Sequence, residues 1–321
     1  MKKLLLIILF IFLVISCSED FEPYGNLQDD FVLNCIIKGD TSFQTLTLAK
    51  SYLVNGMDPY SSTTDPNVYG AVIHIWNGDS VAIFRDTLLE RPEGSKFNYP
   101  YHVYYTTNFK PNPAYPVEIE ARLTDGRKVK SSSIPPKPVA FTYIEKTIPV
   151  EGKQSVRFSW NDGILDQSYI TKLSVNYIKY ENGVAKNMFA EIPLEFVKKD
   201  DNYVAINPSV TNSNVLSVNM ETVTRVMESI SAGDDNKENY EIHYVILQVL
   251  SLDKNLSAYY NSTARNKDAF SVKLDETDYS NIAYGLGVFG VYLKGTYSIP
   301  FKPDYIRSFG YKLGPGYVEL P

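Results

Sequence analysis

A glycine-rich segment near the C-terminus has the spacing of a dinucleotide-binding loop. Gly285, Gly287 and Gly290 form G-x-G-x-x-G, which cradles a pyrophosphate when a buried strand precedes it and a helix follows it. Here a polar, turn-like stretch (275–284) precedes the glycines and a strand-like stretch (288–293) follows them. We therefore interpret the glycines as a close crossing of two backbone segments, where a larger residue would not fit.

The other residues with catalytic or metal-binding chemistry are scattered along the chain. His74, His102 and His243 lack the short ligand spacing of a zinc site, and no Gly-x-Ser-x-Gly elbow is present. Carboxylate pairs such as Asp234 and Asp235 stand in turn-like segments, and adjacent strand residues would face opposite ways. We therefore expect no catalytic residue, no metal and no cofactor, although two distant carboxylates of a glycosidase would leave no local pattern.

An aromatic cluster between two strand-like segments is the best candidate for a binding surface. It contains Tyr99, Tyr101, Tyr104 and Tyr105, in a segment rich in Pro and Asn. Exposed tyrosine rings are rigid and amphipathic, which suits loops that bind sugars or proteins. The alternative is that these rings are ordinary strand residues that cover a sandwich, and their spacing does not decide between the two.

The N-terminus carries chemistry of a different kind, because Cys17 follows the pattern of an export signal. Lys2 and Lys3 precede an apolar run of about 12 residues, which is too short for a bilayer that needs roughly 20. Val14-Ile15-Ser16-Cys17 resembles the bacterial lipobox, in which the cysteine becomes the first residue and is acylated, for example with palmitate. An ordinary signal peptide with a chance cysteine is the alternative.

The residues after Cys17 predict where such a lipoprotein would reside. The second residue of the mature chain would be Ser18, and not the Asp that retains bacterial lipoproteins at the inner membrane, so we expect the outer membrane. Several acyl chains on one cysteine would anchor the protein there stably. Ser18-Glu19-Asp20 resembles the acidic surface-export signal of Bacteroidota lipoproteins, although a solvated tether would look the same. Cys35 lies in an apolar run and is expected to be a buried thiol without a disulfide partner.

Composition bounds the class of protein and its partners. The chain has 321 residues, of which 44% are hydrophobic and 21% charged, so it is globular rather than disordered. Its formal net charge is -6 and it has no basic block, so we expect no nucleic-acid partner. The 25 tyrosines favour strands over helices.

Strand-like segments separated by turns recur along the chain and predict an all-β fold. Asn77-Gly78 and Thr124–Arg127 are typical hairpin turns. Three prolines between 134 and 138 favour an extended connector between two β-sandwich domains. The expected order is a signal peptide at 1–16, an acidic linker at 17–28, an immunoglobulin-like or transthyretin-like sandwich at 29–134, and a fibronectin type III-like sandwich at 139–321.

One segment of the second half breaks the strand period. Four apolar residues between 223 and 230 follow the i, i+3, i+4, i+7 spacing of an amphipathic helix. We expect one short helix at about 220–231, with Asn219 at its start and Gly233 at its end. The segment 255–265 is consistent with a helix or a loop.

Three stretches are similar to signatures of one known family. Tyr69–Ile75 is similar to its "gA-V-x-I" strand, and residues 115–136 to its "Y-x-L-x-I…dG…PP" passage. Ser280-Asn281-Ile282 with the glycine segment at 285–290 is similar to its C-terminal "sNI…G-x-GxFG" signature, the most specific of the three. Together with the lipobox, they resemble the Bacteroidota outer-membrane lipoproteins with domain of unknown function 4249. The resemblance covers most of 17–292 and leaves out the tail at 297–321.

The resemblance implies a role but no established activity, and it gives no catalytic residues to carry over. Members of that family are similar to accessory lipoproteins encoded beside TonB-dependent transporters. We therefore expect a non-enzymatic, surface-anchored binding protein that serves a TonB-dependent transporter. The alternative is a stand-alone glycan-binding or adhesion lipoprotein, with a glycan or peptide ligand at the tyrosine cluster.

Overall fold

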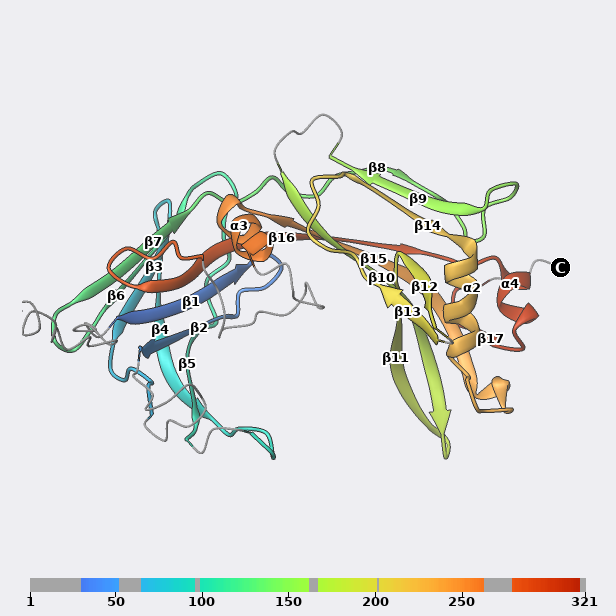
Figure 1. The fold of residues 1–321 in the computed structure, drawn as a ribbon, viewed down its shortest axis with the longest axis horizontal. Coiled ribbons are helices and arrows are strands. Elements are labelled where there is room, and N and C mark those ends of the chain that lie inside the picture. The colour runs from blue at the N-terminus through green and yellow to red at the C-terminus, as the bar shows by residue number, and fades with distance from the viewer. Residues whose placement is uncertain are drawn as a thin grey trace, which may run out of the picture.

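A computed structural model describes residues 30–51, 65–95, 99–161, 167–200, 202–262 and 279–317. These residues form mostly strands, arranged as two halves that share one large sheet (Figure 1). The expected all-β fold with sandwich-like layers is therefore confirmed. Within the described residues, no helix is both long and apolar enough to cross a bilayer.

The N-terminal half is built from strands whose side chains alternate between a core and an outer face. Its elements are β1 (Phe31–Lys38), β2 (Gln44–Lys50), β3 (Val72–Asn77), β4 (Ser80–Leu89), β5 (Tyr101–Thr106), β6 (Val117–Arg122), β7 (Lys128–Ser133) and the first part of β16 (Leu286–Ile299). In β1, Phe31, Leu33, Cys35 and Ile37 are buried and the residues between them are not, because successive side chains of a strand point to opposite faces. These buried residues form one core with the inward faces of the neighbouring strands.

The C-terminal half packs a three-stranded sheet and a helix against the other end of the large sheet. The remaining elements are β8 (Phe141–Ile144), β9 (Ser155–Trp160), β10 (Ser168–Glu181), β11 (Val184–Ile192), β12 (Glu195–Lys199), β13 (Asn202–Ile206), β14 (Val215–Asn219), α2 (Met220–Ser229), the 3-10 turn η2 (Lys237–Asn239), β15 (Tyr240–Leu252), α3 (Lys254–Ser262), α4 (Pro303–Ser308) and β17 (Lys312–Leu313). The small sheet has the order β14-β9-β8. Its Phe158 and Trp160 are fully buried, and Trp160 meets Tyr169 of β10 edge to face, with 5.6 Å between ring centroids. This core holds the two layers together.

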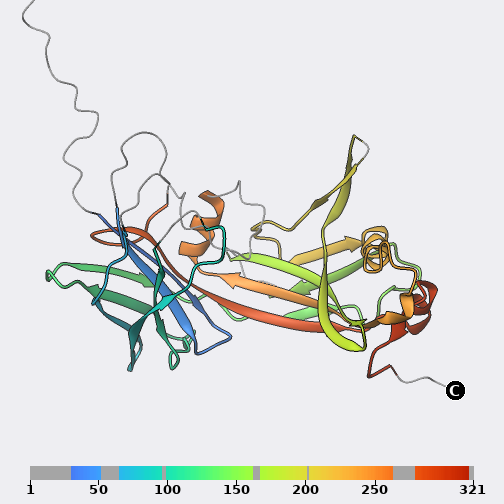
Figure 2. The same cartoon turned by 90° about the horizontal axis from the view of Figure 1, so that it is seen from below.

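One strand, β16, joins the two halves into a single 12-stranded sheet. Its residues Leu286–Tyr292 pair in parallel with β1, and its residues Tyr292–Ile299 pair antiparallel with β15. The strand order is β11-β10-β15-β16-β1-β2-β5-β4-β3-β6-β7, with β17 paired to β15. Figures 1 and 2 show β16 running as one red ribbon from the first half into the second.

The expected domain limits need a correction at this point. Residues 279–292 were expected within the C-terminal sandwich, but they return to the N-terminal half, where Ile282, Phe289 and Val291 are part of the core. The proline-rich connector predicts where the chain leaves the first half, whereas no local pattern predicts that it comes back. The β1–β16 pairing joins segments about 250 residues apart, so it depends on the tertiary fold.

The glycine segment at 285–290 forms a close crossing, as its composition predicts. A Cβ on Gly285 would lie 2.6 Å from the carbonyl oxygen of Phe31, and one on Gly287 would lie 2.2 Å from that of Leu33. Gly287 also has a φ of +111°, which side-chain-bearing residues rarely adopt. A Cβ on Gly290 would lie 2.5 Å from Cγ of Leu256 in α3. The glycines thus let β1 and α3 approach β16 closely.

The predicted hairpins and the predicted helix are present, but the helix ends at Ser229 and not at Gly233, and α3 and α4 are further helices beyond the one expected. Asn219 caps α2, its side chain accepting a hydrogen bond from the backbone N–H of Glu221, and Gly233 has a left-handed φ of +78° after the helix. Asn77-Gly78 joins β3 to β4, and the turn after β6 leads directly into β7. The undecided segment after residue 254 is a helix, α3, as far as Ser262.

Candidate ligand-binding groove

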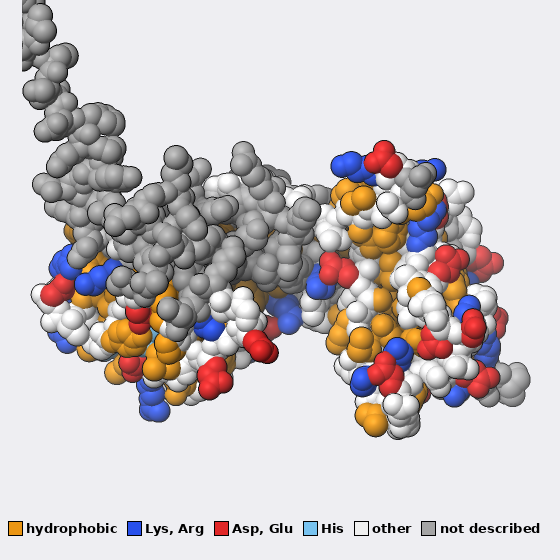
Figure 3. Space-filling model, turned by 60° about the horizontal axis from the view of Figure 1, so that its bottom comes forward, with side chains coloured by type: hydrophobic (Ala, Val, Ile, Leu, Met, Phe, Trp, Pro, Cys, Tyr) orange, Lys and Arg blue, Asp and Glu red, His pale blue; other side chains and the backbone are white. Residues whose placement is uncertain are grey.

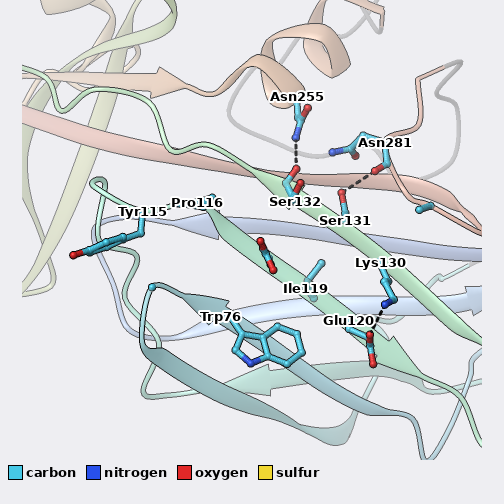
Figure 4. Close-up of a pocket in the computed structure, with 13 residues that line it drawn as sticks. Trp76, Tyr115, Pro116, Ile119, Glu120, Lys130, Ser131, Ser132, Asn255 and Asn281 are labelled. Atoms are coloured by element: carbon cyan, nitrogen blue, oxygen red, sulfur yellow. Dashed lines mark hydrogen bonds and ion pairs between the residues drawn. The ribbon is translucent and has the colours of Figure 1, made fainter.

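A groove of about 910 Å³ lies on the outer face of the N-terminal half (Figure 4). Its floor is formed by β3, β6 and β7, and its opposite wall by the start of α3 and the segment before β16. The lining residues are Trp76, Gly78, Tyr115, Pro116, Glu118, Ile119, Glu120, Lys130, Ser131, Ser132, Asn255, Asn281 and Ala283.

Strand register places the polar and aromatic side chains of the floor in cross-strand rows. Trp76 of β3 lies opposite Glu118 of β6, which lies opposite Ser132 of β7. In the next row, His74 lies opposite Glu120, which lies opposite Lys130. Because residues directly opposite in a sheet share a face, both rows point out of the core. The outer face therefore carries aromatic, acidic, basic and hydroxyl groups side by side.

The far wall of the groove is fixed to the floor by hydrogen bonds. The side chain of Asn281 accepts from the backbone N–H of Phe289 at 2.9 Å and donates to its carbonyl at 2.7 Å. The hydroxyl of Ser131 donates to the carbonyl of Asn281 at 2.7 Å, and Asn255 donates to the carbonyl of Ser132 at 3.1 Å. Both amides are thus used for structure, and the wall is held in place before any ligand arrives.

One buried side chain, Asn77, positions the end of the groove at Tyr115. Its amide donates to the carbonyls of Tyr115 at 2.9 Å and Pro116 at 3.1 Å, and to that of Asn112 at 3.2 Å. The ring of Tyr115 packs on Gly78, where a Cβ would lie 3.1 Å from it. Tyr115 is 50% exposed and projects at one end of the groove (Figure 4). The hairpin turn thus fixes the backbone from which this ring projects.

Ion pairs keep one carboxylate of the floor ionised. Glu120 accepts hydrogen bonds from Lys130 and Lys128, each at 2.9 Å, and these lower the pKa of its carboxyl to about 2. A carboxyl with this pKa holds no proton near neutral pH, so Glu120 is unsuited to act as a general acid. Glu118 has no ion-pair partner in the part of the chain that the structure describes.

The predicted tyrosine cluster lies outside this groove, and its members have different environments. Tyr104 is a core residue, 1% exposed, whose hydroxyl donates to the carbonyl of Val68 at 2.7 Å. Its burial removes it from the predicted binding set, because residues of β5 alternate between the two faces of the sheet. Tyr99 and Tyr101 are half-buried beside the guanidinium of Arg91, which lies 4.9 and 5.2 Å from their ring centroids. Half-buried Tyr105 has Phe43 as its ring neighbour, with centroids 6.1 Å apart.

The other sequence-predicted residues are placed as follows. Cys17 lies outside the described residues. Cys35 is buried in β1, and burial raises the pKa of its thiol, as a core cysteine requires. Within the described ranges, no three His, Cys, Asp or Glu side chains come together in a way that could hold a metal ion.

A second surface, on the C-terminal half, is apolar. At the edge of the large sheet, Val184 and Phe189 of β11 are 59% and 56% exposed. The β12–β13 hairpin projects from the sheet and exposes Val197, Tyr203, Val204 and Ile206 (Figure 2). We call β11 and this hairpin the apolar arms. Figure 3 shows hydrophobic side chains gathered on this half, at the right of the view.

Comparison with known proteins gives the family of the chain. The family model described as "Domain of unknown function (DUF4249)" matches residues 19–298, which is most of the sequence. The chain belongs to this family. No curated protein matches it. In this DUF4249 protein the matched region ends one residue before the end of β16, so it includes the groove and the apolar arms.

Sequence reasoning did not single out the groove residues Trp76, Glu118, Glu120 and Lys130. One signal was present in β3 of this DUF4249 protein, because Ile73 and Ile75 alternate with His74 and Trp76. This alternation predicts that Trp76 faces away from the core, which is unusual for the largest side chain. The wall formed by residues 281–283 gave no such signal, since it meets β7 only in the folded chain.

Proposed function

We propose that this protein is a non-enzymatic, lipid-anchored binding protein of the bacterial outer membrane that serves a TonB-dependent transporter. The lipobox-like sequence before Cys17 and the acidic residues after it support an outer-membrane lipoprotein facing the cell surface. The family assignment is compatible with this role and supplies no competing activity. The structural support comes from two surfaces with different chemistry, one of which suits a ligand and the other a protein.

The exposed apolar arms are the observation that supports a protein partner. A two-stranded hairpin is marginally stable by itself, yet β12–β13 exposes four large apolar side chains to solvent. Strand β11 leaves one edge unpaired within the described chain, and exposed apolar edge strands are sites where another chain can add. A membrane transporter would cover such surfaces and remove their apolar area from water.

The groove supports binding rather than catalysis. The side-chain amides of Asn281 and Asn255 are occupied by structural hydrogen bonds, and the carboxylate of Glu120 is held ionised by two lysines. A rigid, preformed site of this kind lowers the entropic cost of holding a ligand. A binding protein at the cell surface would use it to capture a ligand for the transporter.

Affinity purification of the tagged full-length protein from detergent-solubilised outer membranes tests the proposal. We expect a TonB-dependent transporter to be enriched with the wild type and to be lost with Phe189→Asp or Val204→Asp, which place a charge on the apolar arms. Leu88→Asp is the matched control, because Leu88 is also exposed (54%) but lies on β4 of the other half. Recovery of the wild type without any transporter would refute the proposal.

The second candidate, a stand-alone glycan-binding or adhesion lipoprotein, is favoured by the groove itself. Its aromatic and polar lining suits a ligand whether or not a transporter is present. The same purification separates the two functions, since a stand-alone adhesin would be recovered alone.

A further inference from the structure

The geometry points to a neutral glycan as the ligand of the groove, with a sugar ring seated against Trp76. This inference rests on the proposed binding role and names the ligand class that the role leaves open. Three features support it: the aromatic surface at Trp76, the polar groups beside it that make no hydrogen bond in the described structure, and the charge of the groove.

Trp76 is a half-buried residue that lines the groove. His74, two residues before it on the same strand, stacks on the indole with ring centroids 5.5 Å apart and planes 20° apart. Gly78, two residues after Trp76, also lines the groove and has no side chain. Beyond Gly78 stands the ring of Tyr115, fixed there by the Asn77 hydrogen bonds. The groove therefore begins with an aromatic surface bordered by a second aromatic ring.

Such a surface suits the C–H face of a pyranose. An indole is large, rigid and apolar on its face, so burying it against sugar C–H groups gains contact at a low entropic cost. An extended peptide would instead pair with free backbone groups at a sheet edge. Strands β3 and β6 pair on both sides, and the edge strand β7 already pairs with Ala283 at Lys130 and accepts a hydrogen bond from Asn255 at Ser132. The floor of the groove thus offers side chains to its ligand.

Polar groups without partners lie next to the aromatic surface. The carboxylate of Glu118, the hydroxyl of Ser132 and the hydroxyl of Tyr115 make no hydrogen bond in the described structure. Glu118 is the direct cross-strand neighbour of both Trp76 and Ser132. A carboxylate can accept two hydroxyl hydrogens, and a hydroxyl can donate and accept, which matches adjacent sugar hydroxyls.

The charge of the groove selects among glycans. Lys128 and Lys130 are both paired with Glu120, and Glu118 has no ion-pair partner in the described residues, so these four side chains together carry no net charge. A charged sugar would find no net opposite charge there to offset the loss of its hydration, whereas a neutral one needs none. The volume of about 910 Å³ lies near the top of the range for small-molecule sites, so the groove has space for an oligosaccharide.

The two tryptophans of the chain allow a direct test. Trp160 is fully buried in the C-terminal core, whereas Trp76 lines the groove, so a ligand-induced fluorescence change would report on Trp76. The full-length protein in detergent would be titrated with maltoheptaose, xyloglucan, β-mannan and arabinan as neutral probes. Polygalacturonate would be the acidic probe and a casein digest the peptide probe.

We expect at least one neutral glycan to change the fluorescence and to bind in isothermal titration calorimetry. Trp76→Ala should weaken that binding at least about tenfold, as loss of a central aromatic contact does. Trp76→Phe should weaken it less and remove the fluorescence change. Leu88→Ala is the matched control, because Leu88 is an exposed apolar residue of the same half that does not line the groove, and it should bind normally.

Three results would overturn the inference: no neutral probe bound at millimolar concentration, binding unaffected by Trp76→Ala in a variant with wild-type circular dichroism, or stronger binding of polygalacturonate or peptides. Failure of the proposed function would look different. Trp76→Ala should leave co-purification of a transporter intact, whereas Phe189→Asp should remove the transporter and leave glycan binding unchanged.

Discussion

The buried carboxylate of Asp253 should make the stability of this protein depend on pH in an unusual direction. Asp253 lies between β15 and α3, where the two halves meet, and is 3% exposed. One oxygen accepts from the backbone N–H of Leu256 at 2.6 Å, and the other from that of Val291 at 2.6 Å and from the hydroxyl of Ser133. Burial outweighs these hydrogen bonds and raises the pKa of the carboxyl from 3.8 to about 6.

The sign and size of the effect follow from this shift. A raised pKa in the folded state means that the folded protein binds the proton more tightly than the unfolded chain does. The stability contributed by protonation is therefore fully present below pH 3.8 and is lost as the pH rises through about 6. Relative to pH 7, linkage gives about 1.4 kcal/mol at pH 5 and about 3 kcal/mol in the acid limit. Glu120, with a lowered pKa of about 2, would lose its contribution only at lower pH.

Asp253→Asn isolates this contribution, because the amide does not titrate. The amide also has one acceptor oxygen where the carboxylate has two, so one backbone N–H at α3 or β16 loses its partner, at a cost of about 1–2 kcal/mol. We expect the difference in free energy of unfolding between wild type and variant to grow by about 1.4 kcal/mol between pH 7 and pH 5, measured by urea unfolding. Asp235→Asn, at an exposed loop position, is the control. Parallel pH profiles for wild type and Asp253→Asn would refute the reasoning.

Two further predictions address the crossing of β1 with β16 and the lipid anchor. Gly287→Ala should destabilise the fold by at least about 3 kcal/mol in urea unfolding, because its Cβ would meet the carbonyl of Leu33. Gly316→Ala is the control: Gly316 has a similar φ of +102° but open space around it, so the change should cost only about 1 kcal/mol. Equal losses would contradict the steric explanation. Cys17→Ala should abolish palmitate labelling and move the folded protein from the membrane to the soluble fraction, while Cys35→Ala should leave the label in place; an unlabelled variant that stays in the membrane would refute lipidation.

The sequence allowed prediction of those parts of the fold that are set by neighbouring residues. The turn after Asn77 joins β3 to β4 because Gly78, with a φ of +60°, adopts the left-handed backbone that a tight hairpin needs. Helix α2 formed where its apolar spacing predicted, with the predicted cap at Asn219. Each of these features rests on residues within one turn or one strand, which is why a single sequence was enough.

Features that join distant segments could not be predicted in this way. The glycines at 285–290 indicated a close crossing of two backbone segments, but no residue near them indicates that the other segment is β1. For the tyrosine cluster, proximity in sequence did not show which rings are buried, because adjacent residues of a strand point to opposite faces. Tyr104 and Tyr105 are adjacent in β5, yet one is buried in the core and the other lies on the opposite face.

The segment from Ser280 to Gly290, which resembles the family signature, links the groove to the rest of the molecule. Its Asn281 forms the wall of the groove and pairs with Phe289, while its glycines start β16 against β1. From Tyr292 onward the same strand pairs with β15 in the C-terminal half, which carries the apolar arms. A ligand held against Asn281 therefore contacts a segment that continues, without a flexible joint, into the half proposed to meet the transporter. The strands of the groove floor and β11 of the apolar arms are parts of one sheet, so they cannot be separated by cutting the chain at the prolines between 134 and 138.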